Sequence, residues 1–215
     1  NLKLNESNFK ECKGKIREDT IEIIDIENGK HLKTIKILDE LFKLKKFDSK
    51  ILKIDCLDPT HLTNIEVVNS LEKASHFPDG KVGDLLVSLR ELSTIVLLDK
   101  DTFNIKWHLF DLTKKQFSTL ITNQGNILIL DNSSQSIING TSKLYSIDIK
   151  NKKIENFYEA SGSDLFDVWH RGKMQIYDNS LIISDSLNGK LLQLKCEVIS
   201  TLKNCSKLKT LVNFK

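Results

Sequence analysis

The sequence predicts an all-β fold of the β-propeller class, and two observations support this prediction. An apolar strand, a polar turn led by aspartate and a second strand recur three times along the 215 residues. Further apolar strands accompany these hairpins, which gives consecutive units of about 40 to 50 residues with four short strands each, the size of propeller blades. A two-sheet sandwich would not repeat in this way, and a parallel α/β sheet would need a helical pattern between successive strands.

The three hairpins have the alternation and the polar turns typical of paired antiparallel strands. They are TIEIIDIENGKHLKTIKI at 20–37, TIVLLDKDTFNIKWHL at 94–109 and KLYSIDIKNKKIENFY at 143–158, with turns led by Asp25, Asp99 and Asp148. The companion strands are GDLLVSL from Gly83, GNILILD from Gly125 and NSLIISD from Asn179.

Grouping the strands predicts about three and a half blades. Complete blades are expected at 62–109, 116–158 and 173–214, and residues 20–37 supply half of an earlier blade. Propellers usually close with four to eight blades. We therefore interpret residues 1–215 as a single partial propeller domain, the missing blades of which come from the same longer chain or from a partner chain.

One short helix is expected after the first hairpin. The segment LDELFKLKKF interrupts the strand pattern, and Leu38, Leu41 and Phe42 share one helical face. This spacing predicts a helix that covers one face of the propeller.

Composition and charge exclude several classes of partner. The net charge is +3, and the lysine clusters at 43–46 and 150–153 have no aromatic platform beside them, so nucleic acid is not expected as a partner. No apolar stretch is long enough for a membrane span. The four cysteines form no CxxC pair, and the sequence leads us to expect neither a metal site nor a cofactor.

Cysteines and sequons indicate an oxidising compartment, secreted, periplasmic or otherwise extracytoplasmic. Cys196 and Cys205 are close enough in sequence to close a hairpin-sized loop, whereas Cys12 and Cys56 would pair over a long span or stay free. Candidate glycosylation sequons, some of which chance alone would produce, occur at Asn5, Asn132, Asn139 and Asn204. No hydrophobic signal region follows Asn1, so we expect a processed product or a fragment.

Candidate functional residues concentrate in one blade. The segments DPTHLTNIEVVNS and GDLLVSLRELSTIVLLDKDTFNIKWH place His61, Asn64 and Arg90 near strand ends. Imidazole, amide and guanidinium groups together suit sulfate, phosphate or carboxylate. The alternative is an ordinary turn histidine and an ordinary strand-end arginine. We expect the three side chains to converge on the axis side of the blade and to bind an anion there.

These segments resemble the arylsulfotransferase family, which takes sulfate from an aryl sulfate ester rather than from a nucleotide donor. The resemblance covers nearly everything from Glu18 onward and rests on EDTIEIIDIENGKHLKTIKILDELF, DPTHLTNIEVV, DLLVSLRELSTIVLLDKDTFNIKW and GNILILDN with TSKLYSIDI. It implies a six-bladed propeller, usually periplasmic or secreted, with an active site at the central channel. In such a site a histidine takes the sulfuryl group covalently and passes it to a phenol.

The resemblance assigns catalytic roles to residues of this chain. His61 and Arg90 match the group that binds sulfate and stabilises the transition state. The asparagine of the family lies two residues after that histidine, where this chain has Thr63. Asn64 would serve only after a one-residue shift, and in a regular strand such a shift turns a side chain to the other face.

The nucleophile is the larger departure from the family pattern. A glutamine followed by a histidine is expected about eight residues before the glycine of the GNILILD strand, and here Gln116 is followed by Phe117. Phenylalanine cannot accept a sulfuryl group, and the next histidine along the chain is His170. His170 and Arg171 are expected to face the channel and bind substrate, or to be ordinary loop residues.

Two functions therefore stay open. One is sulfate transfer from aryl sulfate esters to phenolic acceptors. The other is that of a non-catalytic relative, which binds an anionic small molecule in the same channel, or a glycan or protein partner on its surface.

Overall fold

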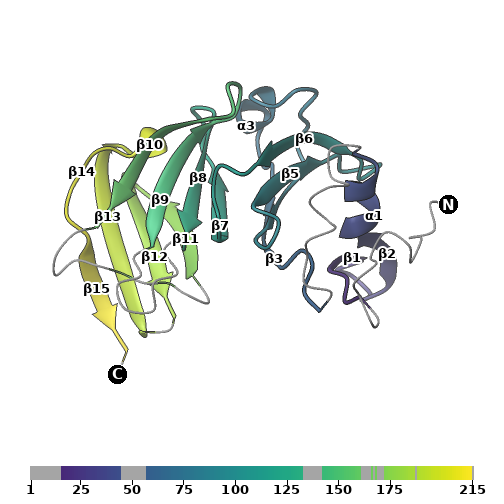
Figure 1. Ribbon diagram of the computed structural model, residues 1–215, viewed down its shortest axis with the longest axis horizontal. Coiled ribbons are helices and arrows are strands. Elements are labelled where there is room, and N and C mark those ends of the chain that lie inside the picture. Colours follow the sequence, from purple (N-terminus) through teal and green to yellow (C-terminus); the bar gives the residue numbers. More distant parts are fainter. Residues whose placement is uncertain are drawn as a thin grey trace.

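Four antiparallel sheets follow one another along the chain and form an arc (Figure 1). The structure is a computed structural model, and it describes residues 16–44, 57–132, 142–160, 166, 168, 172–186 and 188–214. Strands that are consecutive in sequence are neighbours within the first three sheets, as in propeller blades, and in the fourth sheet the fifth strand pairs with the third. The predicted fold class is confirmed.

The sheets match the predicted blades closely. The first sheet contains β1 (Thr20–Ile24) and β2 (His31–Lys36), and the second contains β3 (Leu62–Val67), β4 (Leu85–Leu89), β5 (Thr94–Leu98) and β6 (Ile105–Phe110). The third contains β7 (Gln116–Ile121), β8 (Asn126–Asp131), β9 (Lys143–Asp148) and β10 (Lys153–Glu159). The fourth contains β11 (Gly172–Tyr177), β12 (Ser180–Asp185), β13 (Lys190–Val198), β14 (Lys203–Cys205) and β15 (Lys209–Asn213).

The first strand of each complete sheet is its inner strand. The strand β7 lies against both β3 and β11, although each belongs to a different sheet. Since the inner strands of a propeller surround its axis, side chains on these three strands can meet across sheets. This arrangement positions the candidate functional site.

The predicted helix is present as α1 (Ile37–Phe42), directly after β2. Its buried residues Ile37, Leu38 and Leu41 pack with apolar residues of the first and second sheets. The helix therefore closes the space between these two sheets.

A second short helix, α3 (Leu71–Ser75), corrects the expectation of one helix. The Ser70 hydroxyl caps it by accepting a hydrogen bond from the Lys73 N–H at 3.2 Å, and Ala74 is buried. Five residues are too few to show a helical period, so the prediction missed this helix. None of the described helices has the length and hydrophobicity needed to traverse a bilayer.

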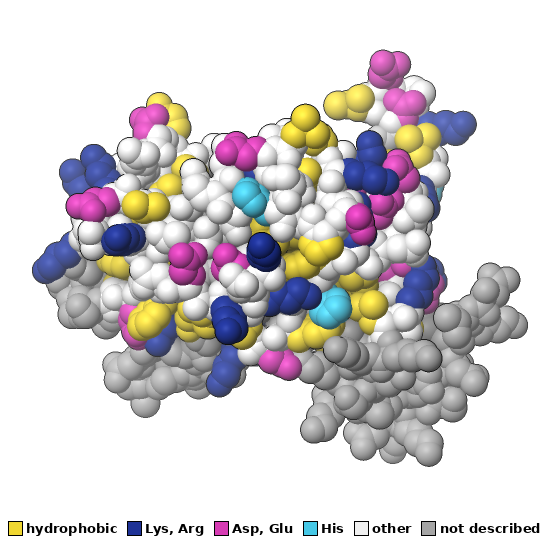
Figure 2. Space-filling view, turned by 90° about the horizontal axis from the view of Figure 1, so that it is seen from above, with side chains coloured by type: hydrophobic (Ala, Val, Ile, Leu, Met, Phe, Trp, Pro, Cys, Tyr) yellow, Lys and Arg dark blue, Asp and Glu magenta, His cyan; other side chains and the backbone are white. Residues whose placement is uncertain are grey.

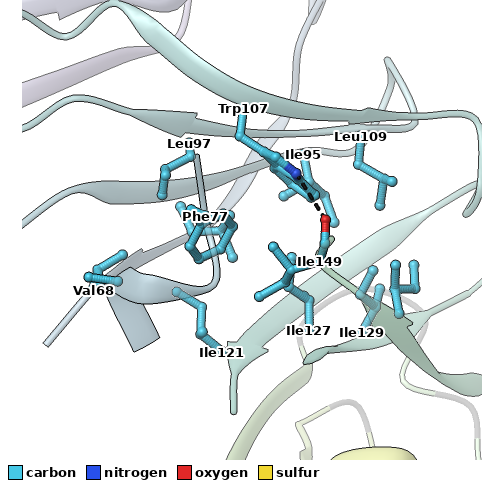
Figure 3. Packing of buried hydrophobic residues seen from close by; sticks show 13 residues of the cluster. Val68, Phe77, Ile95, Leu97, Trp107, Leu109, Ile121, Ile127, Ile129 and Ile149 are labelled. Carbon is cyan, nitrogen blue, oxygen red and sulfur yellow. Dashed lines mark hydrogen bonds between the residues drawn. The ribbon is translucent and has the colours of Figure 1, made fainter. Parts of the chain in front are cut away.

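The apolar core is divided into layers between consecutive sheets. On β8 every residue is buried, and alternate residues serve different layers: Ile127 and Ile129 face the second sheet, whereas Leu128 and Leu130 face the fourth. Figure 3 shows the layer between the second and third sheets, where the Trp107 indole N–H donates to the Ile149 carbonyl at 3.2 Å. Burial on both faces explains why this strand is a continuous apolar run in the sequence.

The repeated aspartate turns share one geometry. Each has an aspartate carbonyl oxygen that accepts a hydrogen bond from the main-chain N–H four residues later, and that later residue has a positive φ. The pairs are Asp25 with Gly29, Asp99 with Phe103, and Asp148 with Lys152. Hydrogen bonds from the N–H groups of Thr102 and Asp101 hold the pKa of Asp99 well below its usual range. The aspartate is thus the residue that sets each turn.

A disulfide joins Cys196 of β13 to Cys205 of β14, which face each other across the antiparallel pair. Among the candidate glycosylation sites, Asn204 is exposed, and Asn5 and Asn139 lie outside the described residues. The Asn132 side chain is buried, donates to the Val168 carbonyl at 2.8 Å and accepts from the Ser142 hydroxyl. A glycan is attached through Nδ2, so its attachment to Asn132 would require this buried side chain to move, and the glycosylation sites stay predictions.

Candidate functional site

His61 lies immediately before β3. Two hydrogen bonds hold the main chain at this position. The Asp19 carboxylate accepts the N–H of Leu62 at 2.8 Å, and the His61 carbonyl accepts the N–H of Arg90 at 3.1 Å. The residue has a φ of 46°, and its Nδ1 is hydrogen-bonded to the Asp58 carboxylate. The imidazole is about one-third exposed (35%), so it can reach a ligand.

The Arg90 guanidinium lies over the ring of Phe117, with its Cζ 5.0 Å from the ring centroid. One terminal nitrogen donates to the Glu91 carboxylate at 2.7 Å, and only 11% of the side chain is exposed. The Nε atom is buried and has no hydrogen-bond partner among the described residues. The His61 ring meets the same phenyl ring edge-on, with the ring centroids 6.5 Å apart. Phe117 thus brings Arg90 and His61 together.

A β-bulge lies at Thr63 in β3. Leu62 pairs with Leu89 and Asn64 pairs with Ser88, which leaves Thr63 without a cross-strand partner. A bulge of this kind places two residues of one strand opposite one residue of the other. The strict alternation of faces does not hold at this point.

The bulge lets two consecutive side chains reach the same neighbouring strand. Thr63 donates its hydroxyl to the Gln116 carbonyl at 3.1 Å, and Asn64 donates its amide to the Thr119 hydroxyl at 2.9 Å. Both acceptors belong to β7. The expectation that a one-residue shift would turn Asn64 to the other face is therefore wrong here, because the bulge supplies that shift.

Asn64 joins three sheets through its buried amide. Its Nδ2 donates to the Thr119 carbonyl at 3.2 Å, and its Oδ1 accepts from the Lys173 ammonium at 2.6 Å. Because a carbonyl can only accept, the amide nitrogen must face Thr119 and the amide oxygen must face Lys173. Lys173 is an exposed residue, but partial desolvation of its ammonium lowers the pKa of this side chain. The prediction did not include this lysine, since nothing in a single strand shows what lies across the axis.

Gln116, which precedes Phe117, connects the second and third sheets. Its amide donates to the carbonyls of Leu89 and Thr94, both at 3.0 Å, and accepts from the Thr113 hydroxyl at 3.1 Å. The side chain is fully buried. All three bonds are made inside the protein, so the role of this glutamine is to hold the start of β7.

Glu66 is a second residue that the prediction missed. Its carboxylate accepts the N–H of Ile121 at 2.7 Å and lies 3.6 Å from the Lys73 ammonium. Burial raises the pKa of Glu66 to about 7, against the opposing effects of the Ile121 N–H and Lys73. The sequence feature that could have identified Glu66 is an acidic residue within the mostly apolar segment NIEVV.

A family model described as Arylsulfotransferase (ASST) matches residues 3–197. This chain belongs to the arylsulfotransferase family. The match spans the second and third sheets and nearly all of the first three strands of the fourth, and every residue of the site described above lies within it. No curated protein matches the sequence.

Three solved structures resemble this arylsulfotransferase-family chain. A protein of unknown function from Bacteroides caccae has 11% identity and a TM-score of 0.50, over 91% of this chain and 57% of that one. AztD from Citrobacter koseri has 13% identity and a TM-score of 0.39, over 59% and 32%, and apo AztD has 12% identity and a TM-score of 0.41, over 61% and 34%. At such identities the likeness to the Bacteroides protein concerns the fold alone. The chain spans less than two thirds of each of these proteins.

The described site has cations and hydrogen-bond donors, and it has a phenyl ring at the position for which the family resemblance implies a nucleophile. Phe117 is only 6% exposed and is held between Arg90 and His61. The predicted substrate-binding residues His170 and Arg171 lie outside the described residues. Among the residues that are described, no group of three histidine, cysteine or acidic side chains is placed to hold a metal ion.

Proposed function

We propose that this chain is a non-catalytic member of the arylsulfotransferase family that binds a small anionic molecule beside His61 and Arg90. The observation that carries the proposal is Phe117, which is buried at the place where the family resemblance implies a nucleophilic histidine. A phenyl ring has no lone pair with which to attack sulfur. Without that group, the two-step transfer has no covalent intermediate.

The cations around Phe117 support anion binding. The Arg90 Nε is a buried donor without a described acceptor, and a tetrahedral oxyanion is well suited to satisfy it. The His61 Nδ1 is bonded to the Asp58 carboxylate, which holds the ring and leaves Nε2 for a ligand. Together the two side chains could hold a sulfate or sulfate-ester group against one edge of the Phe117 ring.

The experiment that tests this proposal separates binding from turnover. The purified chain is mixed with 4-nitrophenyl sulfate and phenol, and the release of nitrophenol is followed by absorbance. We expect no release above the protein-free rate. Titration calorimetry with inorganic sulfate is expected to show binding that Arg90→Gln weakens about tenfold. The matched control is Arg17→Gln, which removes an exposed arginine shortly before β1.

Two results would contradict the proposal. Sustained turnover by the unchanged chain would show that another residue accepts the sulfuryl group, with His170 the first candidate. Sulfate affinity that Arg90→Gln and Arg17→Gln lower equally would show that Arg90 contributes only general positive charge.

The proposed location is extracytoplasmic, either periplasmic or secreted. The Cys196–Cys205 disulfide supports it, because such bonds persist mainly in oxidising compartments. Alkylation of protein taken directly from its source, followed by mass spectrometry, tests this. The two cysteines should resist alkylation until a reductant is added.

A further inference from the structure

We propose that Lys173 is a ligand of the bound oxyanion and that Asn64 is the positioning residue that holds it. This inference rests on the proposed function, since it names a second cationic group of the same channel. It assigns the anion to a site made by three sheets rather than by one blade.

Lys173 lies near the start of the inner strand of its sheet, as Phe117 does in the preceding sheet. Gln116 pairs with Asp131, the last residue of β8, and Gly172 pairs with Asp185, the last residue of β12. Phe117 and Lys173 each follow these paired residues, but Phe117 lies at a bulge without a cross-strand partner, whereas Lys173 pairs with Ser184. The Lys173 ammonium reaches Thr63 and Asn64, which lie two and three residues after His61 in the chain.

The ammonium of Lys173 is held by neutral oxygens. Its Nζ donates to the Asn64 Oδ1 at 2.6 Å and lies 3.5 Å from the Thr63 carbonyl. An ammonium group has three N–H bonds, and these two acceptors use at most two of them. At least one donor is left for a ligand.

Several cations between positions 61 and 115 have carboxylate partners. Arg90 and Lys115 both contact Glu91, His61 contacts Asp58, and Lys73 contacts Glu66. Within the described part of the chain, Lys173 has no carboxylate within ion-pair distance.

The charge on Lys173 is thus one that an incoming anion can neutralise without displacing an acid. Partial desolvation alone lowers the pKa of the lysine, and a bound oxyanion would raise it again. The chemistry that fits is a small tetrahedral oxyanion such as sulfate or a sulfate ester. Its oxygens can accept from the ammonium while the Asn64 amide stays bonded to β7.

Asn64 acts on the anion through the lysine. Both polar atoms of its amide are already used, by Thr119 and by Lys173. Removing the amide should free the ammonium to move without removing a ligand of the anion. Asn64→Ala should therefore weaken sulfate binding less than Lys173→Gln does.

The test is titration calorimetry with inorganic sulfate at constant ionic strength. Lys173→Gln is expected to raise the Kd about tenfold, whereas Lys173→Arg, which keeps the charge, should change it less than about threefold. The matched control is Lys209→Gln, which removes an exposed lysine from β15. An equal loss in Lys173→Gln and Lys209→Gln would overturn the inference.

A spectroscopic readout follows the lysine itself. After reductive methylation with 13C-labelled formaldehyde, the resonance missing in Lys173→Gln identifies Lys173. We expect this resonance to titrate at lower pH than those of fully solvated lysines, because the ammonium is partly desolvated, and to move to higher pH when sulfate is added. If the pH at which this resonance titrates does not change when sulfate is added, direct contact between Lys173 and sulfate is contradicted.

The outcomes distinguish this inference from the proposed function. If Arg90→Gln weakens binding but Lys173→Gln does not, the inference fails and the proposed function stands. If the unchanged chain binds no sulfate, the proposed function fails and the inference fails with it. If Lys173→Gln weakens binding and Arg90→Gln does not, the lysine is the ligand, and the role in anion binding proposed for Arg90 is wrong.

Discussion

The guanidinium of Arg90 rests on the face of Phe117, with the Cζ atom 5.0 Å from the centroid of the ring. Arg90 follows directly after β4 of the second sheet, whereas Phe117 belongs to β7 of the third. The position at which the family resemblance implies a nucleophile thus serves as a packing surface for a cation.

Phe117→Leu is expected to lose the attraction between the guanidinium and the ring while keeping most of the apolar volume. Such contacts are worth about 0.5–2 kcal/mol. Urea unfolding of Phe117→Leu, Arg90→Gln and the double variant measures the coupling between the two residues. Strictly additive losses would show that the ring and the guanidinium do not interact.

Phe117→His is expected to restore a group that can accept a sulfuryl group from 4-nitrophenyl sulfate. Mass spectrometry should detect a sulfuryl adduct on this variant. Turnover should stay slow, because a misplaced group loses much of the rate. Phe214→His, at an exposed position, is the control and should form no adduct. An equal adduct in both variants would indicate non-specific chemistry.

Glu66 makes stability depend on pH. Its pKa is about 7 in the folded protein and near its ordinary value of 4.5 in the unfolded chain. The folded state therefore holds a proton that the unfolded state releases, and this stabilising effect is full below about pH 4.5 and lost as the pH rises through 7. A pKa that differs by one between the folded and unfolded states changes the free energy of unfolding by about 1.4 kcal/mol.

Urea midpoints at pH 5 and pH 8 test this prediction. Glu66→Gln should show a smaller fall in stability between the two values than the unchanged chain. The control is Glu72→Gln on α3, an exposed acid close in sequence, which should leave the pH dependence intact. Parallel pH profiles for Glu66→Gln and the unchanged chain would contradict the assignment.

Trp107→Phe is expected to destabilise the contact between the second and third sheets. The change removes the indole N–H, which donates to the Ile149 carbonyl at 3.2 Å, and leaves that carbonyl buried without a donor (Figure 3). The expected cost is about 1–3 kcal/mol by urea unfolding. Tyr177→Phe, at an exposed aromatic residue, should change stability by less than about 0.5 kcal/mol.

The double variant Cys196→Ser with Cys205→Ser is expected to lose about 2–3 kcal/mol of stability, because the disulfide closes a short loop in the unfolded chain. Thermal unfolding without reductant measures the effect. An unchanged midpoint would show that the pairing of β13 with β14 needs no cross-link.

The distribution of charged side chains on the surface explains why the net charge of the chain does not indicate a class of partner. Figure 2 shows basic and acidic side chains interspersed over the face seen from above, without a continuous area of one sign. The net charge of +3 from 32 basic and 29 acidic residues is consistent with this mixture.

Much of the fold could be predicted because its signals are local. The turns led by Asp25, Asp99 and Asp148 repeat the same hydrogen bonds between residues a few positions apart, so the repeat is visible in sequence and in structure. Burial on both faces makes β8 a continuous apolar run. The helix α3 escaped prediction because a cap and five residues leave no periodic pattern.

The blades, the short helix after the first hairpin and the residue types around the channel could all be predicted from local patterns in the chain. Which of these residues meet depends on how separate sheets pack. The bulge at Thr63 turns Asn64 toward β7, and the packing of inner strands brings Lys173 to Asn64 across 109 positions. Periodicity reports which face of a strand is buried, whereas contacts across the axis depend on strand register and on the packing of separate sheets.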